Sequence, residues 1–151
     1  MGLSIIAACA LLLGCNPESD PELISSNFLE KAEKAFADRS PRSLRELISK
    51  DYLDTQQRDA KEISAIGTGY IMRSRSIYLF TDLESAVFSG AQIHATVLAA
   101  FAARPVSNRS LLPRMDADLY WFEIVLTKES GDWKLLQSSW RQAMLEDVVS
   151  D

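Results

Sequence analysis

Apolar side chains recur every three or four positions in the first half of the chain, which is the spacing of an amphipathic helix. The first such segment opens with Ser19 and has Glu22 at the third position after it. This arrangement predicts a capping box, with Pro21 in the tolerated first turn. The apolar stripe of the segment consists of Ile24, Phe28, Ala32, Ala35 and Phe36. We therefore expect one face of this helix to be buried.

Two further helices are expected before the pattern changes. A short helix begins at Ser40-Pro41, and a third begins after Asp59, where Glu62 completes the pattern of another capping box. A polar connection over 51–57 separates them. Gly67-Thr68-Gly69 interrupts the third helix without following a strand, so it indicates close packing of the helix against the sheet and not a phosphate loop. The two apolar stripes consist of Leu44, Leu47 and Ile48, and of Ile63, Ile66, Tyr70 and Ile71.

After Ser74 the hydrophobic period shortens to about two, and residues that favour strands become frequent. The first predicted strand is long and bulged near Asp82, and a turn over 89–91 leads into the second strand. A Gly131-containing turn joins the last two strands as a hairpin. The four predicted strands span 76–88, 92–102, 119–128 and 133–142.

Helices followed by a run of antiparallel strands indicate an α+β fold. A four-stranded sheet cannot leave its apolar face in water, and the three apolar helix stripes supply the cover. We therefore expect three N-terminal helices packed in a curved four-stranded antiparallel sheet. The result is a cone with an opening at one end.

Composition narrows the possible functions. The chain has 151 residues, which suits one domain, and its formal net charge is -5. An acidic chain of this kind is a poor partner for nucleic acid, because neutralising phosphates needs a basic surface. The chain holds one His and two Cys, so we expect no metal site, haem, iron–sulfur cluster or other cofactor.

The N-terminus carries a separate signal. An apolar run from Leu3 to Leu13 is too short to span a bilayer but has the length of a signal-peptide core. It leads into Leu12-Leu13-Gly14-Cys15, which resembles the bacterial lipobox. That resemblance implies that residues 1–14 are removed and that Cys15 is lipidated. The alternative is a buried N-terminal helix that ends at Cys15.

The lipobox resemblance also implies a location. Asn16 follows the Cys, and by the sorting rule of such lipoproteins this residue directs the protein to the outer membrane, facing the periplasm. Anchoring in the inner membrane remains the alternative. The mature chain then divides into a lipidated Cys and tether over 15–21, a folded domain over 22–144 and an acidic tail over 145–151.

Between about Leu23 and Met144 the order of elements resembles the nuclear transport factor 2-like (NTF2-like) superfamily, which includes ketosteroid isomerases, polyketide cyclases and scytalone dehydratase. The similar segments are Asp51–Leu53, Arg58–Ile63 and Gly131–Trp140. The resemblance implies a pocket between the helices and the sheet, and dimerisation through the outer sheet face in many members. It implies no single chemistry.

Three residues are candidates for acid–base chemistry. Tyr52 and Asp54 lie where the mouth of the cone is expected, and a Tyr hydroxyl beside a carboxyl can act as a donor and a base. The interpretation we favour is instead an Asp near a helix C-terminus followed by a packing Tyr. His94 is the only imidazole, and its strand neighbours Gln92 and Thr96 are polar. That face indicates solvent or a dimer contact, with a general base inside the cone as the alternative.

Aromatic side chains are the candidates for binding. Tyr70 on the third helix, with Trp121 and Trp140 on the last two strands, either pack in the core or line a ligand cavity. Trp121 facing outward beside Val125 would instead form an exposed apolar patch of the kind that marks a partner surface. The loop 103–114 carries three Arg and no acidic residue, which indicates either a solvated loop or attraction to anionic lipid headgroups.

Taken together, these patterns predict a membrane-anchored periplasmic lipoprotein. Its domain is expected to bind a small apolar ligand or a protein partner without catalysis, either as a monomer or as a homodimer. The alternative function is an isomerase-, dehydratase- or cyclase-like enzyme that uses the Tyr52/Asp54 pair in the cone.

Overall fold

The computed structural model describes residues 16–149. The predicted signal segment 1–14 and Cys15 lie outside the described residues, as do the last two positions of the predicted tail. No helix between residues 16 and 149 has the length and apolar character needed to cross a membrane.

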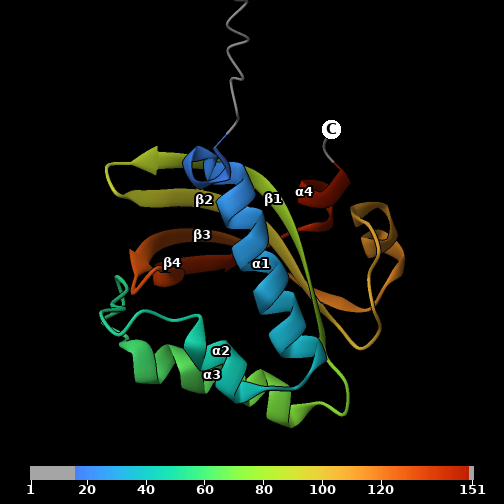
Figure 1. Ribbon diagram of the computed structural model, residues 1–151. Coiled ribbons are helices and arrows are strands. Elements are labelled where there is room, and N and C mark those ends of the chain that lie inside the picture. Colours follow the sequence, from blue (N-terminus) through green and yellow to red (C-terminus); the bar gives the residue numbers. More distant parts are fainter. Residues whose placement is uncertain (1–15, 150–151) are drawn as a thin grey trace, which may run out of the picture.

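Helices come first and strands follow, in the predicted order (Figure 1). The helical part holds a 3-10 turn η1 (Pro17–Ser19), then α1 (Pro21–Ala37), α2 (Pro41–Glu46) and α3 (Ala60–Arg73). The strands are β1 (Tyr78–Ser89), β2 (Gln92–Ala102), β3 (Ala117–Glu129) and β4 (Asp132–Gln142). Between β2 and β3 lies a second 3-10 helix η2 (Arg109–Arg114), and α4 (Leu145–Val149) follows β4.

The four strands form one antiparallel sheet in the order β1-β2-β3-β4. The register of β1 on β2 shifts between Leu83 and Ser85, so the predicted bulge is present, two residues beyond Asp82. A second shift beside Val125 bends the β3–β4 pair. Bulges increase local twist, and the sheet curves around the helices as Figure 1 shows.

The inner face of the sheet holds the main core. Ile93, Ala95 and Val97 alternate along β2 and are buried against α1, whose stripe contributes Ile24 and Phe28. Helix α1 crosses the sheet, while α2 and α3 lie together at one end of it (Figure 1). The stripe of α1 therefore covers the sheet directly, whereas the stripes of α2 and α3 pack at its end, where Ile71 is buried beside Phe36 and Ile77.

Two capping predictions have different outcomes. The box formed by Asp59 and Glu62 at the start of α3 is confirmed, since each side chain accepts a hydrogen bond from the other residue's backbone. The box at Ser19 is wrong: Asp20 caps α1 by accepting from the amides of Glu22 and Leu23. The Ser19 hydroxyl instead donates to the carbonyl of Asn16, inside η1.

The region predicted as a loop over 104–114 and the predicted acidic tail over 145–151 both contain helical turns, η2 and α4. Leu112 of η2 and Val148 of α4 are buried against Leu98 and Ala100 on the outer face of the sheet. These two β2 residues would otherwise leave apolar surface in water, which is why the segments fold onto them. Part of the outer face is therefore covered by the chain itself.

Candidate functional site

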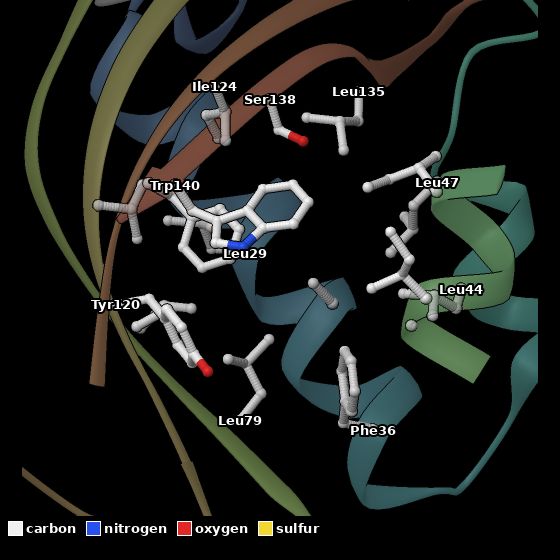
Figure 2. Close-up of a pocket in the computed structure, with 18 of the residues that line it drawn as sticks. Leu29, Phe36, Leu44, Leu47, Leu79, Tyr120, Ile124, Leu135, Ser138 and Trp140 are labelled. Atoms are coloured by element: carbon white, nitrogen blue, oxygen red, sulfur yellow. The ribbon is translucent and has the colours of Figure 1, made fainter. Parts of the chain in front are cut away.

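A cavity of about 300 Å3 lies between the inner face of the sheet and helices α1, α2 and α3. Most of the side chains around it are aliphatic or aromatic (Figure 2). The helices contribute Leu29, Phe36, Leu44 and Leu47, and the strands contribute Leu79, Tyr120, Ile124, Leu135 and Trp140. A cavity of this size and character suits a small apolar ligand.

None of the residues that line the cavity carries a carboxyl, an imidazole or a basic group. The polar atoms on its wall are hydroxyl groups and one indole nitrogen. They belong to Tyr70, Thr81, Tyr120, Ser138 and Trp140. Thr81 is already engaged, because its hydroxyl donates to Glu33 Oε1 at 2.5 Å.

Gly67 brings α3 close to α2 at the helical wall of the cavity. A Cβ at this position would overlap the end of the Leu44 side chain. The predicted close packing is therefore present, but it is between two helices and not between the helix and the sheet. The close approach places Leu44 and Gly67 together on the cavity surface.

Aromatic rings line the cavity on the side of the sheet, and Tyr70 of α3 contacts them from the helical side. Tyr70 stacks on Phe101 with ring centroids 5.0 Å apart, and Phe122 stacks on Trp140 at 5.6 Å. The guanidinium of Arg58 lies 4.3 Å from the Trp140 ring centroid. This cation–π contact holds the indole in place, and Figure 2 shows the ring projecting into the cavity.

Two tyrosine hydroxyls meet on the cavity wall. The hydroxyls of Tyr70 and Tyr120 are 3.1 Å apart. This hydrogen bond, together with burial, raises the pKa of Tyr120 to about 12. Tyr120 therefore stays a neutral phenol at physiological pH. The wall can offer hydrogen bonds but no charge.

Tyr52 and Asp54 come together in a buried cluster behind the cavity wall, and not at an open mouth of the cone. The Tyr52 hydroxyl donates to Asp54 Oδ2 at 3.1 Å and lies 2.8 Å from the Ser138 hydroxyl. Arg58 Nε also donates to Asp54 Oδ2, at 2.7 Å. Asp54 and Tyr52 are each 2% exposed, and neither lines the cavity.

The pKa values of this pair move in opposite directions. Burial raises the pKa of Tyr52, and the nearby Asp54 charge adds to that rise. Burial by itself would also raise the pKa of Asp54, but hydrogen bonds from the Arg58 side chain and from two backbone amides outweigh it. The pKa of Asp54 is therefore held below its ordinary value. Asp54 is a paired carboxylate, and Tyr52 is a neutral phenol.

The other candidates lie on the outer face of the sheet. His94 is exposed, with Val87 and Val125 as its neighbours on the adjacent strands, and it does not line the cavity. Trp121 also faces outward, but it is half-buried in the cluster that η2 and α4 form on the sheet. Dimerisation through this outer face stays a prediction, and η2 and α4 already occupy part of it.

Arg109 of η2 connects the two segments on the outer face, η2 and α4, to strand β1. Its guanidinium pairs with Asp82 and Glu84 of β1 and donates to the backbone carbonyls of Asp147 and Val148 in α4. The predicted basic loop therefore offers Arg104 and Arg114 to solvent, whereas Arg109 is largely engaged inside the protein.

Two functional positions were missed by the sequence analysis. The pairing of Arg58 with Asp54 could not be predicted, because both residues precede α3. In a loop, a separation of four residues does not place two side chains next to each other. Ser138 could have been found, since it shares the inner face of β4 with Trp140 by alternation.

No protein-family model matches the chain, and no curated protein sequence matches it. Solved structures do match. A Streptomyces avermitilis protein of the NTF2-like family, proposed to be a dehydratase, aligns with a TM-score of 0.65 at 12% identity, over 85% of this chain and 99% of that one. A Novosphingobium aromaticivorans protein, proposed to be a scytalone dehydratase, aligns with a TM-score of 0.63 at 11% identity, over 80% and 83% of the two chains.

Bd1075 of Bdellovibrio bacteriovorus aligns with a TM-score of 0.62 at 12% identity, over 79% of this chain but only 40% of that larger one. At such identities the likeness establishes the fold and says nothing of the reaction. The predicted α+β class, with helices in a curved four-stranded antiparallel sheet, is confirmed as the NTF2-like cone fold.

Proposed function

We propose that this protein binds a small apolar molecule in the cavity between its helices and its sheet. The observation that carries the proposal is the composition of the wall, which combines aliphatic side chains with stacked aromatic rings and includes no carboxyl, imidazole or basic side chain. Removing an apolar molecule from water into such a space is favourable in proportion to the apolar area buried.

The same wall supports the choice of a neutral ligand. An ion that enters an apolar cavity loses its hydration, and this cost is severe unless a charged partner is present. The Arg58 guanidinium, which lies against the Trp140 ring, is already paired with Asp54. A charged molecule would therefore find no counter-ion on the cavity surface.

Binding without catalysis is the form of the proposal that the Tyr52/Asp54 cluster supports. An isomerase or dehydratase needs an acid or base that reaches the ligand, commonly a carboxyl with a raised pKa. The pKa of Asp54 is lowered, its oxygens accept four hydrogen bonds, and it does not line the cavity. The enzymatic alternative requires this cluster to open toward the ligand.

Native mass spectrometry of the full chain purified from its own host tests the proposal. We expect a bound small molecule that leaves on denaturation. A cavity-filling variant, Ala99→Leu, should lose it, because Ala99 is buried and lines the cavity. The matched control, Ala91→Leu, adds the same carbon atoms at an exposed turn and should keep the ligand.

Two results would contradict binding in this cavity. One is a ligand retained equally by Ala99→Leu and Ala91→Leu. The other is a wild-type protein that neither carries a molecule nor takes up any member of a panel of neutral apolar compounds. A bound compound that leaves chemically altered would instead support the enzymatic alternative.

We also propose that the domain is anchored to the outer membrane through lipid on Cys15. Support comes from the sequence alone: the Leu12-Leu13-Gly14-Cys15 motif and the apolar run before it. Mass spectrometry of the mature chain should find an acylated N-terminal Cys15, and the protein should stay with outer membranes after a carbonate wash. Cys15→Ser should prevent both, whereas the matched control Cys9→Ser should change neither. A Cys15→Ser protein that still resists the wash would overturn the anchor.

A further inference from the structure

Ser138 connects the cavity to the buried polar cluster behind it. Its side chain lines the cavity, and Figure 2 shows the hydroxyl at the wall between Ile124 and Leu135. The same hydroxyl oxygen lies 2.8 Å from the oxygen of Tyr52. The direction of this hydrogen bond decides what Ser138 can offer to a ligand.

Asp54 fixes the direction at the far end of the chain of hydrogen bonds. Its Oδ1 accepts from the backbone amides of Gln56 and Arg58, at 2.9 and 3.1 Å. Its Oδ2 accepts from Arg58 Nε at 2.7 Å. A carboxyl surrounded by these donors is ionised, and an ionised carboxylate can only accept.

The contact with Asp54 therefore determines whether the Tyr52 hydroxyl donates to Ser138 or accepts from it. This hydroxyl has one proton, and that proton is directed to Asp54 Oδ2 at 3.1 Å. The Tyr52 oxygen must then accept from Ser138, because two oxygens with no proton between them would repel each other at 2.8 Å. The Ser138 proton points toward Tyr52, and the lone pairs of the Ser138 oxygen are left to accept from a ligand.

We infer that Ser138 presents a hydrogen-bond acceptor to the cavity, and that the ligand is a neutral apolar molecule with a hydroxyl or N–H donor that meets it. This inference rests on the proposed binding function and names the class of molecule bound. The Trp140 indole on the wall can only donate. The Thr81 hydroxyl donates its proton to Glu33, and the Tyr70 and Tyr120 hydroxyls bond to each other, so a variant of Ser138 decides which acceptor the ligand meets.

A pair of probes with the same ring system tests the direction. 2-Naphthol can donate a hydrogen bond, and 2-methoxynaphthalene cannot. Isothermal titration calorimetry on the full chain should find 2-naphthol bound about 5-fold more tightly, the size expected for one hydrogen bond in a protein. Hydrophobicity alone predicts the opposite order, because the ether has the larger apolar surface.

Two variants separate Ser138 from the rest of the wall. Ser138→Ala removes the acceptor, so the preference for 2-naphthol should disappear. Tyr52→Phe removes the oxygen that accepts the Ser138 proton, so Ser138 becomes free to donate. The ether should then bind more tightly to Tyr52→Phe than to the wild type. Circular dichroism of each variant checks that the fold is kept.

The outcomes distinguish this inference from the proposed function. Equal binding of the two probes by the wild type, or a preference that survives in Ser138→Ala, overturns the assignment of Ser138 while the cavity stays a binding site. A wild type that binds neither probe and carries no ligand of its own overturns the binding function itself.

Discussion

Replacing Asp54 with Asn tests whether the buried cluster behind the cavity stabilises the fold as its geometry indicates. The substitution keeps the size of the side chain and an oxygen at Oδ1, which can still accept from the amides of Gln56 and Arg58. It places an NH2 group where Oδ2 was. That group then faces two donors, Arg58 Nε and the Tyr52 hydroxyl.

The expected loss follows from those two contacts. A hydrogen bond to a charged group contributes about 1.5–3 kcal/mol, and removing one partner of a buried ion pair costs about 3–5 kcal/mol. The Asp54 side chain is 1% exposed, but that of Arg58 is 21% exposed and can recover some hydration. We therefore expect the free energy of unfolding to fall by about 3 kcal/mol at neutral pH.

The effect must also depend on pH. Because the pKa of Asp54 is lower in the folded protein than in the unfolded chain, its charge stabilises the fold above the unfolded pKa of about 3.9. This stabilisation is lost as the pH falls through the folded pKa. Asp54→Asn lacks it at every pH. The difference between wild type and variant should be constant near neutrality and should shrink below about pH 4.

Urea unfolding followed by tryptophan fluorescence measures the difference at several pH values. Asp51→Asn is the matched control, because Asp51 is exposed three positions earlier, and it should change the free energy by less than about 0.5 kcal/mol. A loss from Asp54→Asn as small as the control's, or one that does not shrink in acid, would refute the reasoning about this cluster.

Three other predictions concern the outer face of the sheet and the wall of the cavity. Arg109→Ala should speed hydrogen exchange throughout α4, because Arg109 donates to two carbonyls of that helix, whereas Arg114→Ala should not. Gly67→Ala should gain up to about 1 kcal/mol of helix propensity in a Leu44→Ala background and less in the wild type, where the new Cβ meets Leu44; equal gains in urea unfolding would contradict the close approach. The hydroxyl of Tyr120 should titrate near pH 12 by ultraviolet absorbance, and stability should decline as the pH rises from about 10; titration at the ordinary Tyr pKa of about 10 would exclude the hydrogen bond to its neighbour.

The hydrophobic periodicity of the sequence was sufficient to predict the helices, the strands and their order. Each element must bury one face, and this produces a regular spacing of apolar residues within its own segment. The stripe from Ile24 to Phe36 and the alternation along β2 both lie on the faces that the structure buries. The start of α1 was placed one residue too early. Ser19 and Asp20 are both good N-caps, and only the turn η1 decides between them.

The candidate site was harder to predict, because it depends on contacts between distant segments. Tyr52 and Asp54 are close in sequence, and their pairing was considered only as the alternative to a packing role for the Tyr. Their dependence on Arg58 and Ser138 was not predicted, since Ser138 lies on the last strand of the sheet. The cover on the outer face was missed for a similar reason. Nothing in the local sequence indicates that Arg109 joins β1 to α4.

The cavity itself supports the choice of binding over a purely structural role for this fold. The space is lined almost wholly by apolar side chains, and apolar surface left in contact with water costs about 25 cal/mol per Å2. Larger side chains at positions such as Ala99 or Ala32 would fill the space and remove this surface from water, yet both residues are small and line it. Water is a poor substitute for a ligand, because the wall offers few polar partners to hold it. A molecule that fills the cavity covers this apolar surface, and the small side chains on the wall keep room for that molecule.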